Sequence, residues 1–226
     1  MADARRQTVQ IDSSSITGKD LGAVVSTTMS VAIASNPNAI SILIVGSRGT
    51  GGQLSSASRD GNNYTKAKGS TVYDGCFTEI WYLVNPDRDT GDITVNFSGT
   101  CSNRSYIGHI ALYNVDQKDP VNITDEASAN AGSISSTFTA TENNCVAVEG
   151  QFNTGNTPGT LNAGQTEIHK RSAGDSGGCS YETDIDAQSE TVGWANFETG
   201  TTAVSQAVVV FQGCIPSGGA FLLNFI

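Results

Sequence analysis

Long hydrophobic runs are absent from this chain. No stretch reaches the roughly 18 consecutive apolar residues of a membrane-spanning helix, so we expect no contact with a membrane. The first residues, MADARRQTVQIDSSS, also lack the apolar core of a secretory signal peptide. We therefore expect synthesis in a cytoplasm, with any exit from the cell by another route, such as lysis around an assembled particle.

Basic side chains are few and scattered. The chain has 12 Lys and Arg residues against 22 Asp and Glu residues, which gives a formal net charge of -10. A surface that binds the phosphates of DNA or RNA needs clustered Lys and Arg. The sequence therefore argues against a nucleic-acid partner.

Metal-binding spacings are missing as well. The five cysteines form no CxxC pair, so no zinc site is expected. Asp87, Asp89 and Asp92 crowd one loop, but Gly91 occupies the fifth position, where a calcium-binding loop needs a ligand. We predict no metal ion, no cofactor and mostly buried free thiols, while one or two disulfides formed after release remain an open alternative.

What the chain does contain is a series of short β-type segments. Hydrophobic residues make up 38% and charged residues 15%, and much of the remainder is Ser, Thr, Gly and Asn, which disfavour long helices. The predicted strands cover 27–33, 40–47, 78–85, 93–99, 104–115, 133–140, 145–152, 165–172, 179–186, 191–197 and 203–212. This pattern predicts an all-β fold, a single Ig-like or jelly-roll antiparallel β-sandwich with extended terminal segments.

Two strand pairings follow from the turns. Segments 78–85 and 93–99 flank a Pro/Gly turn, which predicts a hairpin. Segments 165–172 and 179–186 are expected to pair across a glycine-rich loop. The stretch 116–132 between these pairs is expected to be irregular.

The chain shows no repeat of fixed period and no linker that divides it. We expect an N-terminal arm at residues 1–20, one β-sandwich domain at 21–212 and an apolar C-terminal tail at 213–226. The tail is too apolar to remain free in solvent, so it is expected to pair with a neighbouring subunit or with a sheet edge of its own domain.

The run Gly174-Asp175-Ser176-Gly177-Gly178 resembles the loop around the nucleophile of trypsin-like serine proteases. Such an enzyme also needs a histidine base and an orienting carboxylate. His109 lies within a strand pattern and His169 lies on the segment that leads into the same turn, and neither stands in a protease-like context. A turn of glycines and short polar residues explains the same letters. We therefore predict no catalytic residue, and a serine protease is the remote alternative.

Acidic and aromatic residues suggest two further types of site. Asp184, Asp186 and Glu190 lie at a strand end, where paired carboxylates could serve glycoside hydrolysis, but a solvated, charged sheet edge is preferred. Aromatic residues could form a sugar-stacking surface, although their alternation within strands favours core packing for Trp81 and Trp194. These residues are Trp81, Tyr82, Tyr106, Tyr113, Tyr181 and Trp194.

Two segments carry a family pattern. The stretch EIWYLVNPDRDTGDITVNFSG (79–99) is followed by IALYNVDQKDPV (110–121), and GQT (164–166) and AVVVF (207–211) come later in the same order. Together they resemble a β-sandwich domain, with an E-x-W-Y-L-V strand and a V-D-Q-x-x-P loop, that recurs in phage structural proteins and in bacterial surface or secreted proteins. The resemblance covers about residues 8–212 and implies an Ig-like or jelly-roll sandwich without established enzymatic activity.

These observations predict a non-enzymatic virion structural protein that acts through protein–protein assembly. It would be a phage head decoration or capsid-associated protein, or a tail or fibre component, located in the virion. Its expected partners are the major capsid or tail protein and further copies of itself. The residues expected to form the assembly interface are Phe221, Leu222, Leu223, Phe225 and Ile226. The alternative is a carbohydrate-binding or adhesive module, extracellular or at the cell surface, that binds a host-surface glycan.

Overall fold

The computed structural model describes residues 6–102, 104–172, 174–197 and 202–215, and these residues are almost entirely β-strand. A single 3-10 turn, η1 (Thr50–Gly52), interrupts them. The strands are β1 (Gln10–Asp20), β2 (Ser26–Ala32), β3 (Ile40–Arg48), β4 (Leu54–Arg59), β5 (Asn62–Asn63), β6 (Thr65–Gly69), β7 (Cys76–Val84), β8 (Thr90–Phe97), β9 (Tyr106–Tyr113), β10 (Val121–Asn130), β11 (Ile134–Thr139), β12 (Cys145–Asn153), β13 (Thr160–Leu161), β14 (Thr166–Arg171), β15 (Ser176–Ile185), β16 (Ser189–Ala195) and β17 (Ala203–Phe211). The all-β, antiparallel prediction is confirmed.

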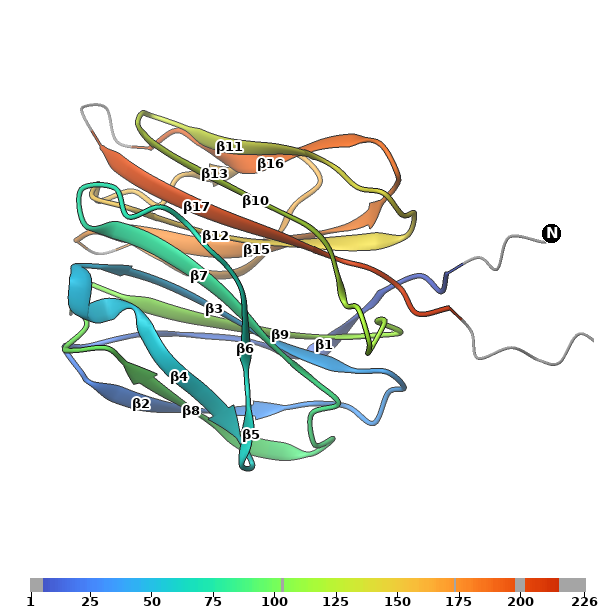
Figure 1. Ribbon diagram of the computed structural model, residues 1–226. Helices are drawn as coiled ribbons and strands as arrows, with labels where there is room; N and C mark the ends of the chain where they lie inside the picture. Colours follow the sequence, from blue (N-terminus) through green and yellow to red (C-terminus); the bar gives the residue numbers. More distant parts are fainter. Residues whose placement is uncertain (1–5, 103, 173, 198–201, 216–226) are drawn as a thin grey trace, which may run out of the picture.

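The strands form four sheets that lie one above another (Figure 1). Outer sheet 1 has the order β2-β8-β4-β5, and inner sheet 1 has the order β1-β9-β3-β7-β6. Inner sheet 2 follows with β10-β17-β12-β15-β14, and outer sheet 2 closes the stack with β11-β16-β13. The sequence led us to expect two stacked sheets, so the number of layers is a finding of the structure.

The stack is built from two units with the same topology. In the first unit β1 lies beside β9, then β3, β7 and β6; in the second unit β10 lies beside β17, then β12, β15 and β14. The outer sheets match in the same way, since β2-β8-β4 corresponds to β11-β16-β13. Each unit therefore pairs its first strand with its last, as a jelly roll does.

The two units also pack in a two-fold manner. Strand β3 contacts its counterpart β12 across the inner sheets, β1 contacts β14, and β6 contacts β10. Exchanging the units maps the β3–β12 contact onto itself and turns the β1–β14 contact into the β6–β10 contact. The chain therefore has an internal pseudo-two-fold axis that passes between β3 and β12.

Apolar side chains fill the three spaces between the four sheets. Val148 belongs to the layer between the inner sheets, Leu43 to the layer under outer sheet 1, and Phe138 and Trp194 to two clusters under outer sheet 2. Strands β12 and β17 are buried along their whole length, and β3 and β9 except at one end, because another sheet covers each of their faces. Their nearly continuous apolar sequences follow from this two-sided burial.

Tyr106 joins the two inner sheets. Its ring is fully buried, and its hydroxyl lies 2.9 Å from the Gln151 carbonyl oxygen and 2.7 Å from that of Gly178 on inner sheet 2. A Cβ atom at Gly46 would lie 2.2 Å from the Tyr106 ring, and one at Gly177 would lie 2.6 Å from it. Both glycines therefore provide the space that the ring occupies.

The expected hairpin of 78–85 with 93–99 is wrong. Strand β7 lies in inner sheet 1 and β8 in outer sheet 1, so the turn between them carries the chain from one sheet to the next. The burial patterns give the reason. Consecutive residues Cys76–Ile80 of β7 are all buried, which requires a sheet on both faces, whereas β8 buries Ile93, Val95 and Phe97 in alternation and leaves its other face toward solvent.

Several segments without an expected strand also belong to sheets, among them β4, β5, β6 and β13 and the two described next. Residues 10–20, placed in the N-terminal arm, form β1 and pair with β9. Residues 121–130, expected to be irregular, form β10 and pair with β17. Both are edge strands of inner sheets, and their mixed polar and apolar sequences reflect partial burial. The expected pairing of 165–172 with 179–186 is confirmed as β14 with β15.

The two ends of the described chain meet at one end of the stack (Figure 1). The Gln7 backbone N–H donates to the Cys214 carbonyl oxygen at 2.8 Å, and Arg6 forms an ion pair with Asp116 at 3.0 Å. The Val9 N–H donates to the Asn144 carbonyl oxygen at 3.1 Å. The expected interface residues at 221–226 lie outside the described residues.

Candidate functional site

The protease-like run forms the entry to strand β15. Gly174 has a φ of 70°, which favours glycine, and Ser176 is the first residue of the strand. The Ser176 side chain is fully buried, and its hydroxyl donates to the Gly174 carbonyl oxygen at 3.3 Å. Ser176 therefore faces the interior instead of an open cleft.

Asp175 connects the two units of the fold. Its carboxylate is 3% exposed and lies 3.3 Å from Nη1 of Arg48, at the end of β3, and 3.0 Å from Nη1 of Arg104, just before β9. Both arginines come from the first unit, whereas Asp175 belongs to the second. The aspartate of the protease-like run thus has two guanidinium partners and acts as a structural tie.

This assignment predicts different costs for neighbouring substitutions. Asp175→Asn removes the buried charge between Arg48 and Arg104 and is expected to lower the free energy of unfolding by about 2 kcal/mol. Ser176→Ala removes one long hydrogen bond and should cost less than about 1 kcal/mol. Urea unfolding of both variants measures the difference. Equal costs, or labelling of Ser176 by a fluorophosphonate, would contradict the structural role.

The two histidines bind other partners. His109 is fully buried between outer sheet 1 and inner sheet 1, with Nε2 2.8 Å from Ser41 Oγ and Nδ1 2.8 Å from the Ser15 carbonyl oxygen. Burial lowers the pKa of His109 to about 4, so the ring is neutral at pH 7. His169 Nε2 lies 2.9 Å from Asp20 Oδ1. Within the described ranges, neither ring makes a hydrogen bond with Ser176.

The sequence reasoning missed a buried carboxylate in the second unit. Glu149 lies at the centre of β12 and points toward outer sheet 2. Ser180 Oγ donates to Glu149 Oε1 at 2.8 Å and Gln165 Nε2 donates to it at 2.9 Å. Trp194 Nε1 and Gln206 Nε2 donate to the same carboxylate. The available signal was the glutamate within the otherwise apolar segment CVAVEGQF, which marks a buried polar group that needs partners.

Burial has the largest effect on the pKa of Glu149. Removal from water raises the pKa of Glu149 to about 7, although the four donors oppose that change. The side chain is 1% exposed, and the four groups that donate to it among the described residues are neutral. The arrangement is that of a fully satisfied polar network that fixes the contact between two sheets.

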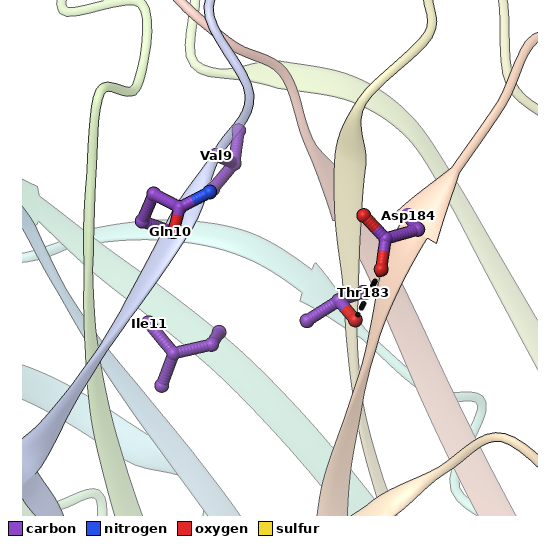
Figure 2. A pocket seen from close by; sticks show the side chains of 5 residues that line it. All are labelled: Val9, Gln10, Ile11, Thr183 and Asp184. Carbon is purple, nitrogen blue, oxygen red and sulfur yellow. Dashed lines mark hydrogen bonds between the residues drawn. The ribbon is translucent and has the colours of Figure 1, made fainter.

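A cleft lies between the two units at the end where the chain termini meet. Figure 2 shows Ile11 of β1 facing Thr183 and Asp184 of β15 across it. Thr183 Oγ1 donates to Asp184 Oδ2 at 3.0 Å. Asp186, the partner suggested for glycoside hydrolysis, accepts a backbone hydrogen bond from Asn144 instead. The cleft therefore holds one carboxylate, and the paired arrangement is not formed there.

Sites for sugar stacking and for a metal ion have little support in the described part of the chain. Its large exposed hydrophobic residues are Val25, Val72 and Ile215. Of the aromatic residues considered for sugar stacking, Tyr106 and Trp194 are buried, and Trp81, Tyr82, Tyr113 and Tyr181 are half-buried. Asp89 binds the buried Arg59 guanidinium at 2.8 Å. No group of His, Cys, Asp or Glu in these ranges could hold a metal ion, and no helix in them is long and apolar enough to span a membrane. The five cysteines are buried free thiols.

No protein-family model and no curated protein matches the chain. The resemblance of residues 8–212 to a phage and bacterial β-sandwich family therefore stays a prediction. Function has to be inferred from the contacts within the chain, in which polar and ionisable groups tie sheets together.

Proposed function

We propose that the chain is a non-enzymatic structural protein of a virion and acts through protein–protein assembly. The observation that carries the proposal is the duplicated jelly-roll topology, in which two like units stack through their inner sheets. Jelly rolls are frequent in viral capsid proteins and in lectins. One fold can serve many functions, so the residues of the sites decide between them.

The sites support an architectural role in preference to chemistry. Asp175 and Tyr106 tie the two units, and Glu149 ties an inner sheet to an outer one. These groups are almost completely enclosed by protein. The lectin alternative ranks lower, because the aromatic rings of the described surface are at least half-buried.

The assembly contact is assigned to the C-terminal tail. Ile215 is 52% exposed and leads directly into that segment. The tail residues proposed to bind a neighbour are Phe221, Leu222, Leu223, Phe225 and Ile226. The proposed partners are further copies of the chain and a major capsid or tail protein.

Truncation after Ile215 tests this assignment. The full chain is expected to form multimers in size-exclusion chromatography with light scattering, and the truncated chain is expected to be a monomer with an unchanged β-type circular dichroism spectrum. Asn224→Ser in the same tail is a matched control and should leave assembly intact. A truncated chain that assembles like the full chain would show the tail assignment to be wrong.

The virion location has its own test. Mass spectrometry of particles purified from lysates of the organism that carries the gene should detect the chain at a copy number comparable with other structural proteins. Absence from such particles would contradict the virion assignment.

A further inference from the structure

The edge strands of the two inner sheets are all protected against further pairing. Each has an interrupted register: β1 between Asp12 and Thr17, β6 between Lys66 and Lys68, β10 between Val121 and Ile123, and β14 between Glu167 and His169. Charged side chains also lie on each of these strands. Bulges and charges are the devices by which proteins prevent edge-to-edge association.

Outer sheet 1 is protected at both edges. Lys19 Nζ donates to the Thr28 carbonyl oxygen of β2 at 3.2 Å and to Thr27 Oγ1 at 3.0 Å. At the opposite side, β5 is two residues long, and the Leu54 N–H of β4 donates to Glu79 Oε2. An additional strand would have to displace these contacts.

Strand β11 of outer sheet 2 has none of these protections. Its six residues pair with β16 in an unbroken register from Ile134 to Thr139, without a charged residue, proline or bulge. Within the described ranges, no hydrogen bond reaches its other edge. Alternate residues of such a strand direct their N–H and C=O groups away from the partner strand, so β11 presents an unpaired ladder.

A single residue difference between the units explains why β2 is covered and β11 is open. The ladders show which residues of the two units are equivalent. In the first unit Lys19 pairs with Ile107, which lies five residues before Leu112 on β9. In the second unit Ala127 pairs with Gln206, which lies five residues before Phe211 on β17. Leu112 and Phe211 begin the equivalent ladders with β3 and β12. Ala127 thus occupies the place of Lys19, and its methyl group cannot reach the strand above it.

We propose that β11 is the acceptor edge for residues 221–226 of another copy of the chain, which add to outer sheet 2 as a further strand. The inference rests on the proposed assembly function and names the surface that the tail binds. Strand addition gains affinity from backbone hydrogen bonds and specificity from side chains on alternate positions.

Length and position favour the tail as the occupant. Eleven residues follow Ile215, and the last six, FLLNFI, equal β11 in length and carry no charged side chain. Pro216, Ser217, Gly218 and Gly219 precede them, and such residues favour turns. Eleven extended residues span about 36 Å, which is enough to reach a neighbouring molecule.

The surface beside β11 is apolar except for Asp125, which alternation places on the same face of β10. Ile123, Ala127 and Ala129 of β10 pack against the clusters under outer sheet 2 but remain partly exposed. Because β10 contacts β11 and forms the edge of inner sheet 2, a strand added outside β11 would lie over these side chains. The added strand would therefore bury apolar area on both partners.

The test uses a pair of complementary variants of the full chain. The acceptor variant Thr137→Lys/Thr139→Lys places charges on exposed positions of β11, and Thr28→Lys/Ser30→Lys is the matched control on β2. The donor variant is Phe221→Ser/Leu223→Ser/Phe225→Ser. Each variant alone, and a one-to-one mixture of the acceptor and donor variants, is measured by light scattering.

We expect the acceptor and donor variants to be monomers, the β2 control to assemble like the wild type, and the mixture to give a heterodimer of two chains. In that mixture one intact tail meets one intact β11. If the wild type assembles and the β11 variant assembles equally well, or the mixture stays monomeric, the acceptor assignment is overturned while the proposed function stands. A monomeric wild type would overturn the assembly function itself.

Discussion

Replacing Tyr106 with Ala is expected to lower the free energy of unfolding by about 4 kcal/mol, since burial of a large aromatic side chain is lost and a cavity is left. The ring is fully buried, stacks on Phe152 with centroids 6.4 Å apart, and crosses from inner sheet 1 to inner sheet 2. Neither sheet can collapse easily into the vacated space, because each is held by its own outer sheet. The lost free energy of unfolding therefore comes from the contact between the two units.

Tyr106→Phe is the control that separates packing from hydrogen bonding. It keeps the ring and removes the hydroxyl that reaches the carbonyl oxygens of Gln151 and Gly178, so a loss of about 1 kcal/mol is expected. Urea unfolding followed by fluorescence and circular dichroism measures both variants. A cost below 1 kcal/mol for Tyr106→Ala would show that the inner sheets do not depend on this side chain.

Glu149 is expected to make the protein less stable as the pH rises from about 4.5 to about 7. Burial raises the pKa of Glu149 from 4.5 in the unfolded chain to about 7 in the folded one, so the folded state retains a proton that the unfolded state has lost in this window. Each pKa unit corresponds to about 1.4 kcal/mol, which gives a loss of about 3 kcal/mol by neutral pH and little further change above it.

The variant Glu149→Gln isolates this contribution. Its amide cannot ionise, so the difference in free energy of unfolding between variant and wild type should shift by about 3 kcal/mol in favour of the variant between pH 4.5 and pH 7.5. Taking the difference cancels other groups, including Glu182, whose pKa burial also raises. A difference that does not vary with pH would show that Glu149 is not desolvated as the structure implies.

The sequence predicted strands better than it predicted their partners. Nearly continuous apolar segments such as ISILIVGS identified β3 correctly, because two-sided burial leaves a clear pattern. The same pattern does not say which sheets provide the cover. The turn after β7 was therefore interpreted as a hairpin, because the polar residues Thr78 and Glu79 hide the two-sided burial of Cys76–Ile80 that the structure shows.

The duplication was not recognised in the sequence, because the two units resemble each other in the order in which their strands pair. The fourth pair of the ladder between β3 and β9 is Leu43 with His109, and the fourth pair between β12 and β17 is Glu149 with Val208. Each unit thus buries one ionisable side chain at an equivalent level, but on different strands. Hydrogen-bond partners from distant segments make either choice tolerable. Identities such as Tyr82 with Tyr181 and Thr65 with Thr166 become apparent only once the ladders are aligned.

Among the candidate residues, the sequence predicted a turn over the Gly174–Gly178 run, but Ser176, Gly177 and Gly178 belong to β15. It did not predict the role of Asp175. Its partners Arg48 and Arg104 are far away in the chain, and only the stacking of the two units brings them together. The same holds for Glu149, whose four donors come from four separate segments. Ionisable residues in apolar strands can be noticed in a sequence, but their partners require the fold.

The internal two-fold arrangement has a consequence for symmetry. A true dimer of identical units presents every surface twice, and a contact between two such dimers can propagate in two directions. Here both halves belong to one chain, and the lysine at position 19 has no counterpart at position 127. Among the described residues, β11 is open while its counterpart β2 is covered, which gives the molecule a polarity that a symmetric pair cannot have.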